Sequence, residues 1–389
     1  MKWFCILILP SLLLPKVLGS CSSLLLTQDA CPLEANPLSK FEAAVERQVA
    51  GQQVAIRTIS KAFAHNMRDY EKWKGSKFSF QSVSSLLSGL PHSIQHVLVE
   101  KEVLRNRTFA QFFHFSGPTG VGKSLVARIL SRCLFAATKG EEGRTKGEEG
   151  SVCGVLEINM RSLSGLKPWQ MSGAMANITG RIRSQLHTCP RSAVILDEIQ
   201  SISYQQLDSM LGQVDLHPPG IFILVSDLGA RKLNASMSRD EATSVIREAA
   251  LVSTYGTSPM LHRIILHNMV PFLPLDEDEL RRVADIELQK LEANFIREYD
   301  MWKGKLTWGR AVSAHIAREC ILNEVYLDDG GRGVETFVHH ELAFMVEVKL
   351  SELLESPARC YNNVDVRVEH GAIRVEVDSV YDKGDFDES

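Results

Sequence analysis

The sequence feature that most constrains the fold is a glycine-rich segment, Gly117-Pro-Thr-Gly-Val-Gly-Lys-Ser124. It fits the pattern G-x-x-x-x-G-K-[ST]. An aromatic, strand-like run at 111–115 precedes it, and apolar residues with helical spacing follow it over 123–137. In this strand–loop–helix order, backbone N–H groups of the loop surround a phosphate and the helix N-terminus adds positive potential. The chain is therefore predicted to bind a nucleotide.

The whole segment is expected to contact that nucleotide. Its residues are Gly117, Pro118, Thr119, Gly120, Val121, Gly122, Lys123 and Ser124. Lys123 is predicted to place its charge on the β- and γ-phosphates, and the Ser124 hydroxyl is predicted to bind Mg²⁺.

A second motif, Ala193-Val-Ile-Leu-Asp-Glu198, is an apolar strand that ends in paired carboxylates. Asp197 is expected to hold the Mg²⁺ shell, and Glu198 to orient the water that attacks the γ-phosphate. An Asp-Glu pair at this place is typical of ATPases, and the chain contains no Asn-Lys-x-Asp guanine motif. ATP and Mg²⁺ are therefore the predicted cofactors.

Further short apolar runs at 155–158 and 221–225 alternate with stretches of helical spacing. Nearly continuous apolar strands separated by helices are typical of a parallel sheet covered on both faces. Asp227 follows the run at 221–225, at a place where ATPases with an added strand usually hold Asn or Thr. A carboxylate there would have to be water-bridged, protonated or turned away from phosphate, so a sensor role for Asp227 stays open.

The N-terminus has the pattern of a secretory signal peptide, predicted over residues 1–19. Lys2 supplies the positive charge, and the apolar stretch Trp3–Leu14 is too short to span a bilayer. An uncleaved anchor and lipoprotein processing at Cys21 are the alternatives. Residues 20–40 are expected to be a linker.

Entry into the secretory pathway would expose the chain to N-glycosylation. The candidate sites are the asparagines of three Asn-x-Ser/Thr tripeptides, Asn106, Asn177 and Asn234. Of the eight cysteines, Cys5 leaves with the signal peptide, so an odd number remains. No Cys-x-x-Cys pair occurs, and a zinc site is not expected. The net charge of −4 gives no electrostatic case for binding nucleic acid.

Two other regions differ in character from the core. A duplicated, charged and glycine-rich tract at 138–150 is predicted to be a solvated loop. Beyond Leu275 the pattern turns helical to about Leu354, and alternating runs at 364–368 and 373–377 then predict a β-hairpin.

Three stretches resemble AAA+ ATPases of the Clp/HSP100 group and, more narrowly, the torsin family. They are Val49-Ala-Gly-Gln-Gln-Val-Ala55, Cys189-Pro-Arg-Ser-Ala-Val-Ile-Leu-Asp-Glu198 and Met269-Val-Pro-Phe-Leu-Pro-Leu275. The resemblance implies an AAA+ α/β fold, a P-loop core with a parallel sheet flanked by helices. It places the nucleotide-binding domain at 41–275, a helical lid at 276–355, and a terminal β-hairpin with an acidic tail at 356–389.

The resemblance also assigns roles to single residues. Arg332, in Gly330-Gly331-Arg332, matches the sensor-2 arginine that reaches the γ-phosphate from the lid, where torsins have Gly-Cys-Lys and Clp proteins Gly-Ala-Arg. Cys31 and Cys189 match a cysteine pair that implies a disulfide. Ser124 is a Clp-like feature, since torsins usually carry Asn there.

Other family features are missing. Ile265 stands where Clp proteins place the arginine that reaches a neighbouring subunit, with Arg263 two residues away. Trp169 is the only aromatic residue near the expected pore loop, and no aromatic-Val-Gly motif follows the second strand. Threading of polypeptide through a ring is therefore not supported.

Together these features predict an ATPase of the endoplasmic reticulum or nuclear envelope lumen that remodels protein clients. It is expected to form oligomers and to be weak until the lumenal domain of a membrane protein supplies an arginine. One alternative is an ATP-gated interaction protein with little hydrolysis, which Asp227 favours. The other is a Clp-type unfoldase or chaperone in an endomembrane-derived compartment, which Ser124 and Arg332 favour.

Overall fold

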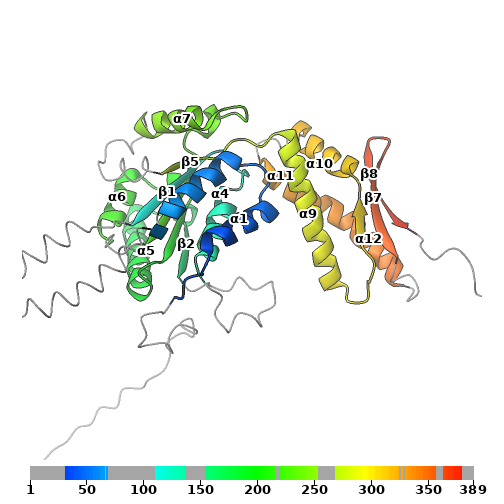
Figure 1. The fold of residues 1–389 in the computed structure, drawn as a ribbon, viewed down its shortest axis with the longest axis horizontal. Helices are drawn as coiled ribbons and strands as arrows, with labels where there is room; N and C mark the ends of the chain where they lie inside the picture. The colour runs from blue at the N-terminus through cyan, green and yellow to red at the C-terminus, as the bar shows by residue number, and fades with distance from the viewer. Residues whose placement is uncertain are drawn as a thin grey trace, which may run out of the picture.

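The chain forms an α/β core and a smaller, mostly helical unit beside it (Figure 1). The computed structural model describes residues 31–65, 67–68, 110–135, 154–214, 220–252, 268–323, 326, 329–355 and 362–378. Within these ranges no helix has the length and apolar character that crossing a membrane requires. Several predictions concern positions outside them, namely the signal peptide at 1–19, Asn106, the repeat at 138–150, Arg263 and Ile265.

The core is built on a five-stranded sheet in the order β2-β3-β4-β1-β5. Its strands are β1 (Gln111–Ser116), β2 (Val155–Asn159), β3 (Ala193–Asp197), β4 (Ile221–Ser226) and β5 (Met269–Pro271). All four pairings are parallel, and β3 and β4 are buried along their whole length. The predicted parallel sheet is confirmed.

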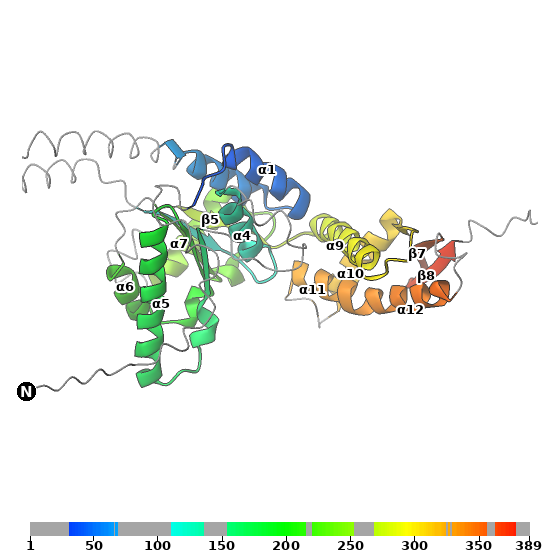
Figure 2. The ribbon, with the colours of Figure 1, turned by 90° about the horizontal axis from the view of Figure 1, so that it is seen from below.

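Helices cover both faces of this sheet, as the strand pattern predicted (Figure 2). One face packs against α5 (Pro168–Thr188), α6 (Tyr204–Gly212) and α7 (Arg239–Val252). The other packs against α1 (Pro37–Gln48), the helical residues 53–65 and α4 (Lys123–Cys133). The predicted break at Gly51 separates the first two, with φ at +68°.

The N-terminal segment corrects one prediction. Residues 31–40 are not a linker, because Leu33 pairs with Phe135 and α1 already begins at Pro37. The Glu34 N–H donates to the Leu134 carbonyl oxygen at 2.9 Å. Apolar Leu33 and Leu38 pack on the core, which the irregular local sequence did not indicate.

The second unit, called the lid below, combines helices with a small sheet. Its elements are α9 (Glu277–Glu298), β6 (Leu306–Trp308), α10 (Arg310–Leu322), α11 (Gly331–Thr336), a π-helical turn (Phe337–Leu342), α12 (Ala343–Leu354), β7 (Asn363–Glu369) and β8 (Ala372–Asp378).

The predicted C-terminal hairpin is present, since β7 and β8 pair antiparallel. It is not a separate module. Strand β6 pairs parallel with β7, and Val364 and Val366 are fully buried in the lid core. The boundary predicted at 356 therefore falls inside one packed unit.

Candidate nucleotide-binding site

The glycine-rich segment forms a loop between β1 and α4 at the carboxyl edge of the sheet. Gly120 and Gly122 have φ of +73° and +92°, a backbone region that glycine enters without steric cost. Gly117 lies very close to Phe272, since a Cβ atom on Gly117 would be 2.2 Å from the carbonyl oxygen of Phe272. Because glycine at the N-cap of α4 brings no capping side chain, the first backbone N–H groups of the helix are left for an anion.

Lys123 lies at the centre of the site. Its Nζ donates to the carbonyl oxygens of Gly117 at 2.8 Å and Pro118 at 2.5 Å. Burial lowers the pKa of Lys123 from 10.5 to about 8, although the carboxylates of Glu198, Asp197 and Asp227 act in the opposite direction. The positive charge of Arg332 adds to the lowering. These four charged residues come from three separate parts of the sequence, and all of them lie close enough to the Lys123 ammonium group to affect its pKa.

Asp197 and Glu198 end strand β3 as predicted. Asp197 is buried, and one of its oxygens accepts the Glu198 N–H at 2.9 Å. Glu198 has φ of +58°, an uncommon conformation for a residue with a side chain. Its carboxylate accepts a hydrogen bond from Gln200 Nε2 at 2.6 Å. Strained backbone of this kind is concentrated at functional sites, which agrees with the predicted role of Glu198.

Asp227 is exposed and follows β4. Because β4 lies between β3 and β1 in the sheet, Asp227 lies between the paired carboxylates and the phosphate loop. Ser116, the last residue of β1, donates to the Leu228 carbonyl oxygen at 2.6 Å and so ties the Asp227 turn to the loop entrance. This geometry suits a sensor, but the sensor role itself stays a prediction.

The lid contacts the phosphate loop directly. The Gly331 N–H donates to the Gly120 carbonyl oxygen at 3.0 Å. Contact is so close that a Cβ on Gly120 would be 1.7 Å from the Asp329 carbonyl oxygen. Arg332 follows in the first turn of α11 and is exposed. The hydrogen bond therefore holds Arg332 beside the loop.

A groove of about 530 Å³ lies between the N-terminal segment and α9. Val45, Val49 and Ala50 line one wall, and Arg282 and Ile286 line the other. A Cβ on Gly122 would lie 4.0 Å from Val49, so the groove adjoins the phosphate loop. No sequence motif indicates the α9 wall, and its position in the first turns of the predicted lid is the one signal that the sequence carries for it.

The site has the oxygen donors that Mg²⁺ prefers. Mg²⁺ is usually held by one or two protein oxygens together with phosphates and water, and the Ser124 hydroxyl and the Asp197 carboxylate fit that set. Among the described residues there is no cluster of three or more metal-binding side chains. A site completed by nucleotide phosphates needs no such cluster.

Cys31 and Cys189 form a disulfide in the structure, with their Cα atoms 6.0 Å apart. The bond joins the N-terminal segment to the end of α5, just before β3, and agrees with the pairing that the family resemblance implied.

Two of the predicted glycosylation sites lie in the described ranges. Asn234 is exposed in a turn, where its Oδ1 accepts from the Ser236 hydroxyl at 2.8 Å. Asn177 is also exposed, but it lies within α5, and Thr179 of the same tripeptide is buried. Glycosylation stays a prediction, and the turn is the better acceptor.

Comparisons with known proteins show what the whole chain is similar to. No protein-family model matches the chain. The chain is 29% identical over 192 residues to a ClpB chaperone from Streptomyces albus G, which covers 46% of this chain and 21% of that protein. It is 22% identical over 197 residues to a torsin-like protein from Drosophila melanogaster, covering 45% and 54%. The chain is thus similar to torsin-like AAA+ proteins and to chaperones of the Clp/HSP100 group.

The AAA+ fold is also seen in a solved structure, the closed state of Hsp104 with ATPγS and FITC-casein. That structure has a TM-score of 0.56 and 17% identity, and it covers 88% of this chain and 52% of the Hsp104 chain. The similarity supports the predicted P-loop core with its lid as an AAA+ fold. The matched region makes up 21% of the ClpB chaperone, 54% of the torsin-like protein and 52% of the Hsp104 chain, so this chain spans about half or less of each of these proteins.

Proposed function

We propose that this AAA+ protein binds Mg-ATP and couples ATP hydrolysis to the remodelling of protein partners in the lumen of the endoplasmic reticulum or nuclear envelope. One observation carries the proposal. Lys123, Asp197, Glu198 and Asp227 of the core and Arg332 of the lid come together at one phosphate loop. This is the set of charges that phosphoryl transfer to water requires.

Each residue has a distinct part in the proposed reaction. Lys123 exchanges its carbonyl partners for the β- and γ-phosphates. Ser124 and Asp197 hold Mg²⁺, which neutralises phosphate charge when bound. Glu198 orients the attacking water, and Arg332 stabilises charge that develops on the γ-phosphate. The groove has a mixed lining, with apolar Val49 and Ile286 beside charged residues such as Arg282, and it accepts the nucleobase between its apolar side chains.

Activation is proposed to come from outside the chain. The described residues contribute two positive charges to the site, Lys123 from the core and Arg332 from the lid. An arginine supplied in trans typically raises turnover by about 10³–10⁵-fold. We therefore propose an oligomeric assembly with a membrane protein whose lumenal domain donates an arginine. The disulfide between Cys31 and Cys189 supports an oxidising compartment.

The test is ATP turnover by the mature chain, alone and with candidate lumenal domains. Slow basal turnover that one domain accelerates, and that its arginine-to-alanine variant does not, is the expected result. Fast basal turnover that scales with self-assembly and is lost in Arg263→Ala would favour a Clp-type unfoldase instead.

A second candidate is an ATP-gated interaction protein with little hydrolysis. Two observations favour it: Asp227 brings a carboxylate close to the phosphate site, and Gln200 holds the Glu198 side chain at 2.6 Å. Firm ATP binding with no turnover in the presence of every activating domain would select this function.

A further inference from the structure

Gln52 joins the N-terminal segment to the chain that leads into the lid. Its Nε2 donates to the Leu273 carbonyl oxygen at 2.7 Å, and the Leu273 N–H donates to its Oε1 at 3.1 Å. One side-chain amide thus pairs with both backbone groups of a residue 221 positions away. Gln52 is only 6% exposed, so water competes little for these bonds.

The backbone at this point adopts an uncommon conformation. Gln52 has φ of +60°, directly after Gly51 at +68°. A left-handed φ is unfavourable for a residue with a Cβ and persists where the surroundings over-determine it. Gly51 itself touches the lid, since a Cβ there would lie 2.3 Å from Glu279 Oε1.

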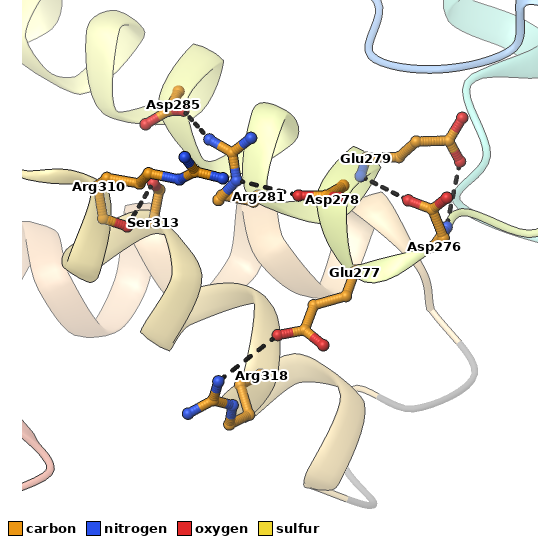
Figure 3. A network of polar contacts seen from close by, with 9 residues as sticks. All are labelled: Asp276, Glu277, Asp278, Glu279, Arg281, Asp285, Arg310, Ser313 and Arg318. Carbon is orange, nitrogen blue, oxygen red and sulfur yellow. Dashed lines mark hydrogen bonds and ion pairs between the residues drawn. The ribbon is translucent and has the colours of Figure 1, made fainter.

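Leu273 lies in the segment where the chain leaves the core and enters the lid. It lies between β5 and α9, and the first turn of α9 is held by a network of polar contacts (Figure 3). Asp276 accepts the Glu279 N–H at 2.8 Å, and Glu279 accepts the Asp276 N–H at 3.1 Å. Arg281 pairs with Asp278 at 3.5 Å and with Asp285 at 3.6 Å. A shift at Leu273 therefore moves the start of α9 as one body.

The same helix forms a wall of the groove. Arg282 and Ile286 of α9 face Val49 and Ala50, the residues that come just before the Gly51-Gln52 turn. The width of the groove thus depends on how Leu273 is held. The residues of the phosphate loop, Lys123 among them, belong to the core, and the lid adds the contact of Gly331 with Gly120 and the side chain of Arg332.

We propose that Gln52 is a positioning residue: its paired hydrogen bonds to Leu273 set the lid so that the groove closes on the nucleobase. This inference rests on the proposed ATP site. Losing both bonds is expected to weaken Mg-ATP binding about tenfold or more. Binding of inorganic tripolyphosphate, which has no base, is expected to weaken by no more than about threefold, because core residues build the loop that receives it and the lid adds only Arg332 to the phosphate contacts.

The experiment compares Gln52→Glu and Gln52→Met with the unaltered chain. Glutamate can still accept from Leu273 but cannot donate to its carbonyl, and methionine keeps the length without either bond. Gln111→Glu is the matched control, since Gln111 Nε2 bonds the Ala62 carbonyl oxygen at 3.1 Å away from the groove. Dissociation constants for Mg-ATP and tripolyphosphate are measured by calorimetry, with thermal unfolding of each variant.

A selective loss of ATP affinity in the Gln52 variants, absent in Gln111→Glu, supports the inference. Equal losses for both ligands would show a merely structural role and overturn it, as would unchanged ATP binding. If Gln52→Glu does not fold, Gln52→Met decides between these outcomes. Failure of the unaltered chain to bind ATP would instead overturn the proposed function, and the inference with it.

Discussion

The core and the lid are stabilised in different ways. In the core, β3 and β4 are buried at every position between two apolar clusters. The lid is built around a single apolar cluster. Both units expose large apolar side chains, among them Leu322 (71%) in the lid and Val252 (83%) in the core. Each unit buries a carboxylate: Asp197 in the core, and Glu287 in the lid, whose oxygens accept from Lys290 at 2.6 Å and contact His339 Nε2 at 3.1 Å.

This difference assigns the two units different tasks. A sheet packed on both faces is stiff and suits a loop that must hold phosphates in one geometry. The lid is held at the site through a few specific polar contacts, among them Gly331 with Gly120 and Gln52 with Leu273. Such contacts can change with nucleotide while each unit stays folded. The predictions below separate core effects from lid effects.

The largest effect is expected in the core. Glu198→Gln keeps the shape and the neighbouring Asp197 but removes the carboxylate that orients water, so turnover should fall by about 10²–10⁴-fold while ATP stays bound. Lys123→Ala should abolish binding instead. Equilibrium binding and steady-state hydrolysis by the two variants check this. Parental hydrolysis by Glu198→Gln would show that the assigned mechanism is wrong.

The disulfide should stabilise the core. Cys31 and Cys189 close a long loop, with a sequence separation of 158. Cys31→Ser is therefore expected to lower the free energy of unfolding by about 3–5 kcal/mol. Chemical denaturation followed by a probe in each unit measures it. A loss confined to the lid probe, or both thiols found free in protein made in a secretory compartment, would contradict the assignment.

The lid contact should affect turnover more than stability. A Cβ at Gly331 would lie 2.9 Å from the Gly120 carbonyl oxygen, so Gly331→Val should displace Arg332 and reduce turnover about 100-fold. Gly309→Ala, in the lid but with open space around it, is the control. Turnover and thermal unfolding are measured together, and equal activity in the two variants would show that the contact has no catalytic importance.

The smallest effect is a pH dependence of binding. The pKa of Lys123 is lowered to about 8, so its charge is lost in the free protein as pH rises through 8. Bound phosphates favour the charged form, and ATP binding should therefore take up protons near this pH.

ATP affinity should consequently fall by up to about tenfold between pH 8 and 9. Folding stability has the opposite trend, because the unfolded chain binds more protons between the lowered pKa and 10.5, and stability rises with pH across that window. Calorimetry in buffers of different ionisation enthalpy checks the proton uptake, and Lys123→Arg should show none. Affinity independent of pH would rule out Lys123 as the titrating group.

Local patterns alone predicted much of this protein. The strand–loop–helix segment at 117–124, the carboxylates at 197 and 198, and the hairpin at 364–377 each depend on neighbours in the chain, where backbone periodicity and glycine chemistry act directly. Family resemblance added Arg332 and the pairing of Cys31 with Cys189.

Tertiary structure decided how these parts meet. The strand order places Asp227 between Glu198 and the phosphate loop, and the groove forms only because α9 comes to lie against the N-terminal segment. Pairing of β6 with β7 made the hairpin part of the lid. The bonds between Gln52 and Leu273 span 221 positions. Contacts of this range arise from packing of whole elements, which no local periodicity encodes.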